Sequence, residues 1–365
     1  MPVTEISEGR TKLIVPAEHS SGGPGKRTSS VFFNEQMAFN RDVSVMFLRA
    51  LEKDVSVADA MSATGSRAVR IANEVPNISD VVANDADPAA AELIAKNIAL
   101  NDLNNCRVSN KDLNILLSEE TFDHVDIDPF GSPAHYLQPA IKGCRKNGIL
   151  AITATDTAPL AGAHRGKCER RYRSRPIRGP MCHEMGLRIL MSSIAYELAK
   201  FDRGMEPMLS FYADHYFRTY VRITEGARNA DRTLSKIIYV KYERDTLERS
   251  YSYERDKEYA YGPFWGGNLH DSAHLSNMNA SFTAEEKRCQ KMLNLWKEEL
   301  DTVPFIYDIS ELSSFLKMSP PPMTDMIDAL SDIGNASMTH VSPTSFKTDL
   351  GLDDIIAVYK KIPRH

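Results

Sequence analysis

Between residues 55 and 156, short apolar runs alternate with helical patterns, and this order limits the possible folds more than any other feature of the sequence. The expected strands are 55–61, 80–85, a short strand ending at 111–113, one ending at Asp128, and 148–156, and the expected helices between them include 67–74 and 88–102. Strands that alternate with helices form parallel sheets. The sequence therefore predicts an α/β fold built on a Rossmann-like sheet.

These strands end in acids or in a loop of small residues. The loop 62–66 is tight enough for backbone N–H groups and a helix N-terminus to approach a ligand. Asp85 is placed to accept from ribose hydroxyls, Asp112 to accept from an adenine amino group, and Leu113 to pack on the ring. The carboxyl ends of parallel strands meet at one edge, which predicts a nucleoside cofactor site. The expected cofactor contacts on these elements are Asp59, Gly65, Asp85, Asp112 and Leu113.

The fourth strand ends in Asp128-Pro129-Phe130-Gly131. A ring amine is a poor nucleophile because its lone pair is delocalised, so an enzyme that alkylates it must hold its N–H groups with acceptors. The Asp128 carboxylate and the Pro129 carbonyl are candidate acceptors, and Phe130 offers a face on which a flipped-out base can stack. The motif predicts an amino-methyltransferase site, and the glycine-poor loop favours S-adenosylmethionine over NAD. The alternative is an ordinary Asp-Pro turn, with the acids of the neighbouring strands serving as helix caps.

Length and composition limit the architecture and the compartment. A chain of 365 residues exceeds one ordinary core and predicts two domains, which we place at 1–224 and 225–365. The sequence has no apolar run of about 18 residues, so we expect neither a signal peptide nor a membrane span. Its five cysteines are widely spaced, without a Cys-x-x-Cys pair. That spacing predicts a cytoplasmic protein and no metal site.

Basic residues gather in one segment although the net charge is −5. The segment 165–178 holds one acid, Glu169, and follows the fifth strand, so it is expected as a loop at the edge that carries the active site. A phosphate backbone bound there would bring a base toward Asp128. The expected nucleic-acid contacts are Arg165, Lys167, Arg170, Arg171, Arg173, Arg175 and Arg178. The alternatives are a solvated loop, or a loop that pairs internally with Glu169 and Glu184.

The remaining chain can be assigned more coarsely. The expected elements are an N-terminal strand pair, a flexible tip at 20–27, a helix at about 180–201, a hairpin of 208–213 with 216–224, helices at 309–318 and 323–333, and a small hairpin of 336–341 with 354–360. The last four segments predict a winged-helix-like unit within a C-terminal α+β domain.

Several motifs, taken in order, resemble one family. They are Phe32-Phe33-Asn34, Asn40-Arg41-Asp42, Ser62-Ala63-Thr64-Gly65, Asp128-Pro129-Phe130-Gly131-Ser132-Pro133, Cys182-His183-Glu184, Ala213-Asp214-His215-Tyr216 and Gly262-Pro263-Phe264-Trp265. Together they are similar to the tRNA guanine-N2 dimethyltransferases that act on guanosine 26, from about residue 5 to the C-terminus. The resemblance implies an enzyme that uses S-adenosylmethionine to methylate the N2 amine of that guanosine in tRNA. The oligomeric state stays open, and we expect a monomer.

The resemblance also implies roles for individual residues. These are Arg41, Arg67, Asp85, Asp112 and Leu113 as cofactor contacts, Asp128 as the catalytic acceptor, and Phe32 and Phe130 beside the target base or the methyl donor. Two features depart from the relatives. Residues 241–261 contain no cysteine where many relatives carry cysteine pairs, and Arg173 follows Tyr172 where relatives usually have glycine.

Two other functions stay open on the sequence alone. An N6-adenine methyltransferase of RNA or DNA uses a motif close to Asp128-Pro129-Phe130, although its fourth position is usually aromatic where this chain has Gly131. The second open function is that of a non-enzymatic RNA-binding protein that keeps the fold. A cytosine methyltransferase that forms a cysteine adduct is disfavoured, since no cysteine follows a proline at a strand end.

Overall fold

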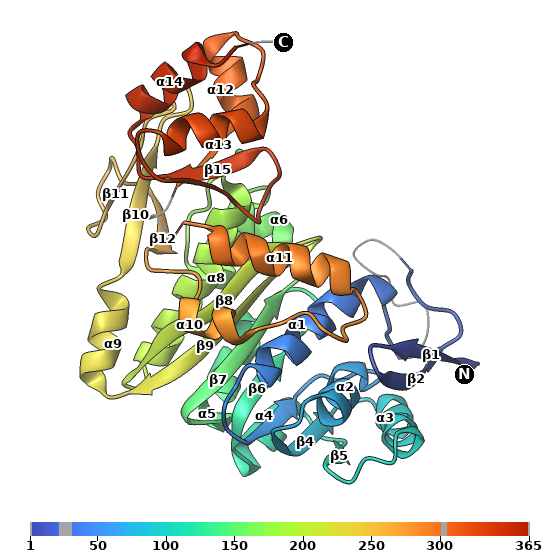
Figure 1. The fold of residues 1–365 in the computed structure, drawn as a ribbon. Coiled ribbons are helices and arrows are strands. Elements are labelled where there is room, and N and C mark those ends of the chain that lie inside the picture. The colour runs from blue at the N-terminus through green and yellow to red at the C-terminus, as the bar shows by residue number, and fades with distance from the viewer. Residues whose placement is uncertain (1, 22–30, 301–304, 364–365) are drawn as a thin grey trace.

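The computed structural model describes residues 2–21, 31–300 and 305–363. Its central strands are β3 (Val55–Asp59), β4 (Ile78–Asn84), β5 (Cys106–Ser109), β6 (Phe122–Ile127), β7 (Cys144–Ala154), β8 (Arg203–Ala213) and β9 (Tyr216–Glu225). Within the described residues they form one seven-stranded sheet of order β5-β4-β3-β6-β7-β9-β8 (Figure 1). The first five strands in sequence run parallel, and the β8–β9 hairpin pairs antiparallel to β7. The predicted Rossmann-like sheet and its closing hairpin are confirmed.

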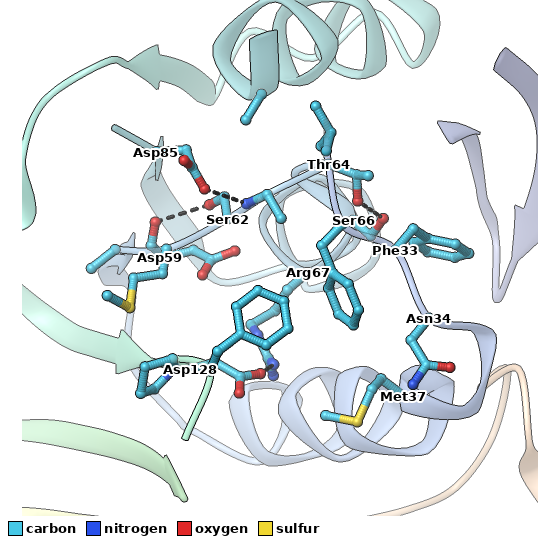
Figure 2. Close-up of a pocket in the computed structure, with 18 of the residues that line it drawn as sticks. Phe33, Asn34, Met37, Asp59, Ser62, Thr64, Ser66, Arg67, Asp85 and Asp128 are labelled. Atoms are coloured by element: carbon cyan, nitrogen blue, oxygen red, sulfur yellow. Dashed lines mark hydrogen bonds and ion pairs between the residues drawn. The ribbon is translucent and has the colours of Figure 1, made fainter. Parts of the chain in front are cut away.

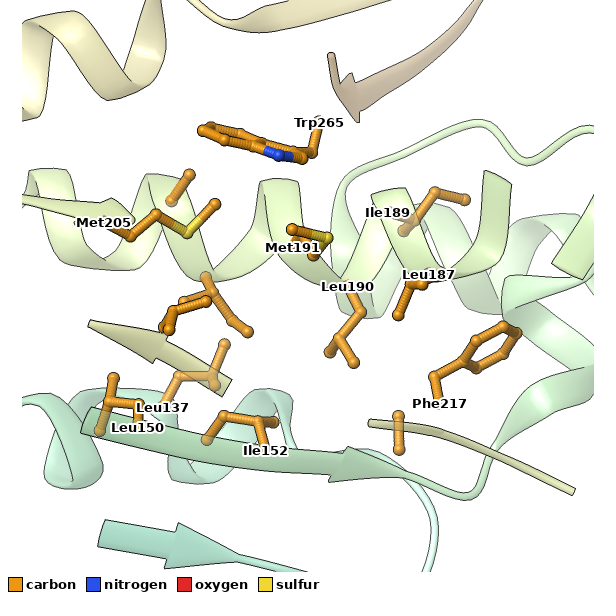
Figure 3. Packing of buried hydrophobic residues seen from close by; sticks show 14 of the residues in the cluster. Leu137, Leu150, Ile152, Leu187, Ile189, Leu190, Met191, Met205, Phe217 and Trp265 are labelled. Carbon is orange, nitrogen blue, oxygen red and sulfur yellow. The ribbon is translucent and has the colours of Figure 1, made fainter. Parts of the chain in front are cut away.

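Helices cover both faces of this sheet. One face carries α1 (Ala38–Arg49), α2 (Ser66–Glu74), α3 (Pro88–Leu100), α10 (Ser272–Asn277) and α11 (Glu286–Glu298). The other carries α4 (Leu113–Glu119), α5 (Leu137–Gly143), α6 (Thr157–Leu160), α7 (Arg165–Tyr172) and α8 (Cys182–Ala199). Successive strand residues point to opposite faces, so on β7 Leu150 and Ile152 join one core whereas Ile149 and Ala151 join the other. Figure 3 shows Leu187 and Leu190 of α8 packed toward β7.

A hairpin of β1 (Val3–Glu8) and β2 (Thr11–Pro16) precedes the sheet, as predicted. It is attached to α3 because the side-chain amide of Asn97 bonds both backbone groups of Ile14, at 2.6 and 3.0 Å. The short helix η1 (Glu35–Met37) then leads into α1. Most of the predicted flexible tip at 20–27 lies outside the described residues.

Later elements form two further small sheets. These elements are α9 (Ala227–Leu234), β10 (Ile237–Tyr242), β11 (Arg249–Ser252), β12 (Tyr261–Trp265), β13 (Ile306–Asp308), α12 (Ile309–Leu316), α13 (Met323–Ser331), β14 (Ala336–Met338), β15 (Ser345–Thr348) and α14 (Leu352–Lys361). The last six form a unit with its own apolar core, drawn at the top of Figure 1. In contrast, α10 and α11 pack into the core of the main sheet. The boundary between residues 224 and 225 stays a prediction.

The prediction of a strand at 354–360 was wrong, since this segment lies in helix α14. Ile355, Val358, Tyr359 and Ile362 are buried, and their spacing of three and four residues is helical. The local alternation of Asp354 to Lys360 resembles a strand only because the segment is shorter than two helical turns. In the structure β14 pairs with β15 instead.

One strand boundary also differs from the prediction. The third strand ends at Ser109 rather than at 111–113, because Asp112 already caps the helix that follows.

No helix in the described part of the chain is long and apolar enough to cross a membrane.

Candidate active site

A cavity of about 590 Å³ opens at the carboxyl ends of β3, β4 and β6 (Figure 2). Its lining includes the predicted residues Phe32, Arg41, Asp59, Arg67, Asp85, Asp112, Leu113, Asp128, Pro129 and Phe130. Gly65 is not among the described lining residues, although its neighbours Thr64 and Ser66 are. The volume lies in the range of small-ligand pockets. Residues far apart in the sequence thus converge at one sheet edge, as the strand-end argument required.

The loop after β3 is held close to α3 and to the tip of β4. Gly65 has φ +77, and a Cβ there would meet Ile94 at 3.0 Å, so a side chain would disturb this close approach. The Ala63 N–H donates to Asp85 Oδ2 at 2.8 Å, and the Asp87 N–H donates to Asp85 Oδ1 at 2.9 Å. Asp85 therefore shapes the loop, and each carboxylate oxygen keeps a lone pair for a ligand.

Asp112 lies at the start of α4, where it accepts from the Asn114 N–H at 2.8 Å. The helix-cap alternative is therefore correct for its local structure. Its carboxylate nevertheless lines the cavity beside Leu113, which is buried. Capping uses one oxygen, so the cap does not rule out a ligand contact.

Asp59 carries a buried carboxylate at the end of β3. Its side chain is 1% exposed, and Oδ2 has no hydrogen-bond partner among the described residues. Burial raises the pKa of this carboxyl, and the positive charge of Arg67 opposes the rise. A buried acceptor without a donor is costly, so the site fits a ligand that brings an N–H donor to Asp59.

Arg67 on α2 connects helix α1 to Asp128. Its Nη1 donates to Asn40 Oδ1 at 2.8 Å and to Ser44 Oγ at 2.6 Å, and Nη2 forms an ion pair with Asp128 Oδ2. Figure 2 shows Arg67 and Asp128 joined by this contact among the residues that line the cavity. The carboxylate of Asp128 is thus fixed by a buried guanidinium. Asn40 belongs to the motif Asn40-Arg41-Asp42, but no role for it was predicted from the sequence.

A fully buried pair, Asp126 with Arg218, lies beneath this contact. Arg218 Nη1 donates to Asp126 Oδ1 at 3.0 Å and to Thr153 Oγ1 at 2.7 Å, and Nη2 bonds Asp126 Oδ2. Burial by itself raises the pKa of Asp126, but Arg218 and Arg67 outweigh burial and lower it. Sequence reasoning missed Arg218. The available signal was a charged residue among the inward-facing positions of β9.

Arg41 lines the cavity, yet its guanidinium is already bound. It donates to the Glu8 carboxylate at 2.7 and 2.6 Å and to the Asn34 carbonyl at 3.2 Å. These contacts attach the N-terminal hairpin to the cavity wall. A direct cofactor contact of Arg41 stays a prediction.

Two aromatic rings stand at the cavity. Phe32 and Phe130 meet edge to face with centroids 4.6 Å apart, and Phe130 is 65% exposed. Behind them, the Gly131 N–H donates to Thr155 Oγ1 at 2.6 Å and the Thr155 N–H to the Gly131 carbonyl at 3.0 Å. An exposed phenyl ring on a fixed turn is suited to stack on a planar ligand. Thr155, at the end of β7, was not predicted.

The basic segment is a helix over 165–172, α7, and not the predicted loop. Cys168 and Tyr172 lie one turn apart on its buried face, which explains why a highly charged segment is ordered. Among the predicted nucleic-acid contacts, Arg165, Arg170, Arg173 and Arg178 are exposed, whereas Lys167, Arg171 and Arg175 are half-buried. A hollow on the outer side is lined by His164, Arg165, Gly166, Lys167 and Arg170.

Two contacts limit which of these cations are free to bind phosphate. Arg171 Nη1 pairs with Asp156 at 2.9 Å, and Arg165 pairs with Glu169 at 2.7 Å. Glu184 pairs instead with Arg188, outside the segment. The internal-pairing alternative therefore holds for Arg171, with Asp156 as the partner, and in part for Arg165.

Arg173 ends α7 with φ +54, in the left-handed region. Glycine adopts this conformation at helix C-termini at the least cost. The backbone at this position therefore suits the glycine that the family resemblance implies, and Arg173 adopts the same conformation.

The strand order and a cavity lined by acids at the strand ends are those of the Rossmann-like methyltransferase class. Comparison with known proteins is more specific. A family model described as N2,N2-dimethylguanosine tRNA methyltransferase matches residues 9–360. The chain belongs to this family.

Individual relatives agree over their whole length. The tRNA (guanine(26)-N(2))-dimethyltransferase of Pyrococcus furiosus is 37% identical, over 99% of this chain and 99% of the relative. The protein of the same name from Saccharolobus islandicus is 35% identical, over 99% of this chain and 100% of the relative. A solved structure of Trm1 from Pyrococcus horikoshii with S-adenosyl-L-methionine is 36% identical with a TM-score of 0.90, and covers 97% of this chain and 99% of that one.

Proposed function

We propose that this chain transfers methyl groups from S-adenosylmethionine to the exocyclic N2 amine of guanosine 26 in tRNA, giving N2-methylguanosine and N2,N2-dimethylguanosine. The proposal rests on the position of Asp128, Pro129 and Phe130 at the cavity, in a chain that belongs to this family. Analysis of the nucleosides of treated tRNA tests it. A monomeric state, a cytoplasmic location and domains 1–224 and 225–365 are proposed with it.

The cavity residues fit S-adenosylmethionine by their chemistry. The Asp85 carboxylate suits ribose hydroxyls, Asp112 and Leu113 suit the adenine, and the unpartnered Asp59 Oδ2 suits a cationic amino group. The guanidinium of Arg67 suits the cofactor carboxylate. When bound, this cofactor supplies a methyl group on a sulfonium sulfur, which is electrophilic without a covalent enzyme intermediate.

The chain's own residues then act on the target amine. Phe130 stacks on the base, Phe32 lies beside the base or the methyl donor, and the Asp128 carboxylate and the Pro129 carbonyl accept hydrogen bonds from the N2 amine. These bonds orient the nitrogen lone pair, and Asp128 takes the proton that the amine loses. The rest of the rate enhancement comes from proximity.

Replacing Asp85 with alanine is expected to weaken binding of S-adenosylmethionine by about 1.5–3 kcal/mol, the range for a hydrogen bond to a charged group. The loss has two sources, since Asp85 also holds the loop through the Ala63 N–H. Calorimetric titration measures it. Asp80→Ala, which removes an acid from the other end of the same strand, is the matched control. An unchanged affinity in Asp85→Ala would leave Asp85 with a purely structural role.

The exposed cations of α7 are expected to bind tRNA phosphates. Changing Arg165, Arg170 and Arg173 together to glutamine should weaken tRNA binding and reduce the slope of log affinity against log salt by roughly 2 to 3 units, at about 0.7–0.9 per contact. Arg171 is left in place because it pairs with Asp156. Cofactor affinity should not change, since none of the three residues lines the cofactor cavity.

The control for this experiment is a triple glutamine variant of Arg228, Arg232 and Lys236, exposed cations on and after α9. This helix follows β9, which runs antiparallel to β7, so it lies at the sheet end opposite the cavity. Filter binding at several salt concentrations compares the variants. An equal slope in the α7 variant and the wild type would mean that other residues bind the tRNA backbone.

A further inference from the structure

Helix α7 is joined to the loop that carries Asp128 and Pro129 through one hydroxyl group. The Tyr172 hydroxyl donates to Asp156 Oδ1 at 2.5 Å and accepts from Ser132 Oγ at 2.8 Å. Ser132 belongs to this loop, and Asp156 follows β7. The three side chains are largely buried, so water competes little for these bonds.

The same carboxylate holds the helix a second time. Asp156 Oδ2 accepts from Arg171 Nη1 at 2.9 Å. A continuous chain of hydrogen bonds therefore runs from the Ser132 hydroxyl through the Tyr172 hydroxyl to the Asp156 carboxylate. Arg171 neutralises the negative charge of this carboxylate. Charge-assisted bonds of this kind are stronger and more directional than neutral ones.

Arg67 holds the Asp128 carboxylate at the start of this loop, and the further attachments of the loop are to Thr155 and Asp156. Its bonds to Thr155 involve Gly131, and the Thr155 hydroxyl is 3.5 Å from the Pro129 carbonyl. The backbone of Asp156 adds one longer bond, from its N–H to the Gly131 carbonyl at 3.3 Å. Ser132 is thus the side chain of the loop by which α7 sets its position.

The opposite side of α7 carries Arg170, which is exposed, and Arg173 follows at the end of the helix. One short helix therefore presents cations outward and the Tyr172 hydroxyl inward. We infer that Tyr172 is a positioning residue that fixes the loop bearing Asp128 and Pro129 to the basic helix, so that the amine acceptors stand in register with the bound tRNA. This inference rests on the proposed function.

Tyr172→Phe tests it, because the ring still fills its buried site and only the hydroxyl is lost. The single-turnover rate at saturating tRNA and cofactor is expected to fall roughly 5- to 20-fold, the equivalent of one or two positioning hydrogen bonds. The dissociation constants of tRNA and S-adenosylmethionine should stay within about twofold. Amide hydrogen exchange at Phe130, Gly131 and Ser132 should become faster, a readout independent of activity.

Tyr242→Phe is the matched control, since it removes a hydroxyl bonded to the Glu311 carboxylate far from the cavity. It should lower stability comparably and leave both readouts at wild-type values. Ser132→Ala removes the same link from the loop side. If Tyr172→Phe and Ser132→Ala act through the same hydrogen bond, the variant that combines them should be no slower than the slower of the two single variants.

A Tyr172→Phe protein with wild-type single-turnover rate and loop exchange would overturn the inference. So would a loss of tRNA affinity that accounts for the whole effect. Failure of the proposed function is a separate outcome, because a wild-type protein that transfers no methyl group to tRNA would show it before any Tyr172 variant is compared.

Discussion

Replacing Asp128 with alanine is expected to lower the rate of methyl transfer by about 10²–10⁴, the usual cost of losing a positioned acid–base group. The carboxylate lies at the cavity and is fixed by the Arg67 guanidinium, so its removal deprives the target amine of the acceptor that we propose for it. Binding of S-adenosylmethionine should change by only a few-fold, because Arg67 keeps Asn40 and Ser44. Single-turnover transfer of a labelled methyl group measures the rate.

The matched control is Asp123→Ala on the same strand. Asp123 bonds Ser56 at the amino end of β6 and does not line the cavity. Its loss should leave the rate of methyl transfer near the wild-type value. If Asp128→Ala kept more than about a tenth of the wild-type rate, Asp128 would not be the acceptor.

Replacing Arg218 with methionine is expected to lower the free energy of unfolding by about 3–5 kcal/mol. The change leaves Asp126 buried without its main partner, and an uncompensated buried charge is strongly destabilising. Chemical denaturation measures the effect. The double variant Arg218→Met with Asp126→Leu should recover part of the loss, because it removes both charges.

Arg107→Met is the control for this prediction, since Arg107 pairs with Glu120 at the surface. Exposed pairs contribute about 0–1 kcal/mol, so this variant should be close to wild type. A similarly small effect of Arg218→Met would mean that the buried pair contributes little to folding.

The sheet and the cavity could be predicted because their signals are local and repeat. Strand, loop and helix recur along residues 55–156, and each strand end carries its own acid or turn. The topology of a parallel sheet then brings these ends together without further information. Asp85 and Asp128 were found in this way, and both line the cavity.

What the sequence could not show depends on contacts between distant elements. Arg218 and Asp126 lie on different strands, and only the strand order places them side by side. Likewise, Arg171 was predicted to face phosphate, but its partner Asp156 precedes the helix and sits beneath it. In α7 the high charge of the segment hid the helical spacing of its buried residues, so a loop was predicted. In α14 a short alternation hid the same kind of spacing, so a strand was predicted.

The most direct test of the account is nucleoside analysis by mass spectrometry of unmodified tRNA incubated with the protein and methyl-labelled S-adenosylmethionine. We expect labelled N2-methylguanosine and N2,N2-dimethylguanosine, with the label at position 26 and lost when guanosine 26 is replaced by adenosine. Labelled methyladenosine would point to an adenine methyltransferase. No label from a folded protein that binds both tRNA and cofactor would contradict the proposed activity itself.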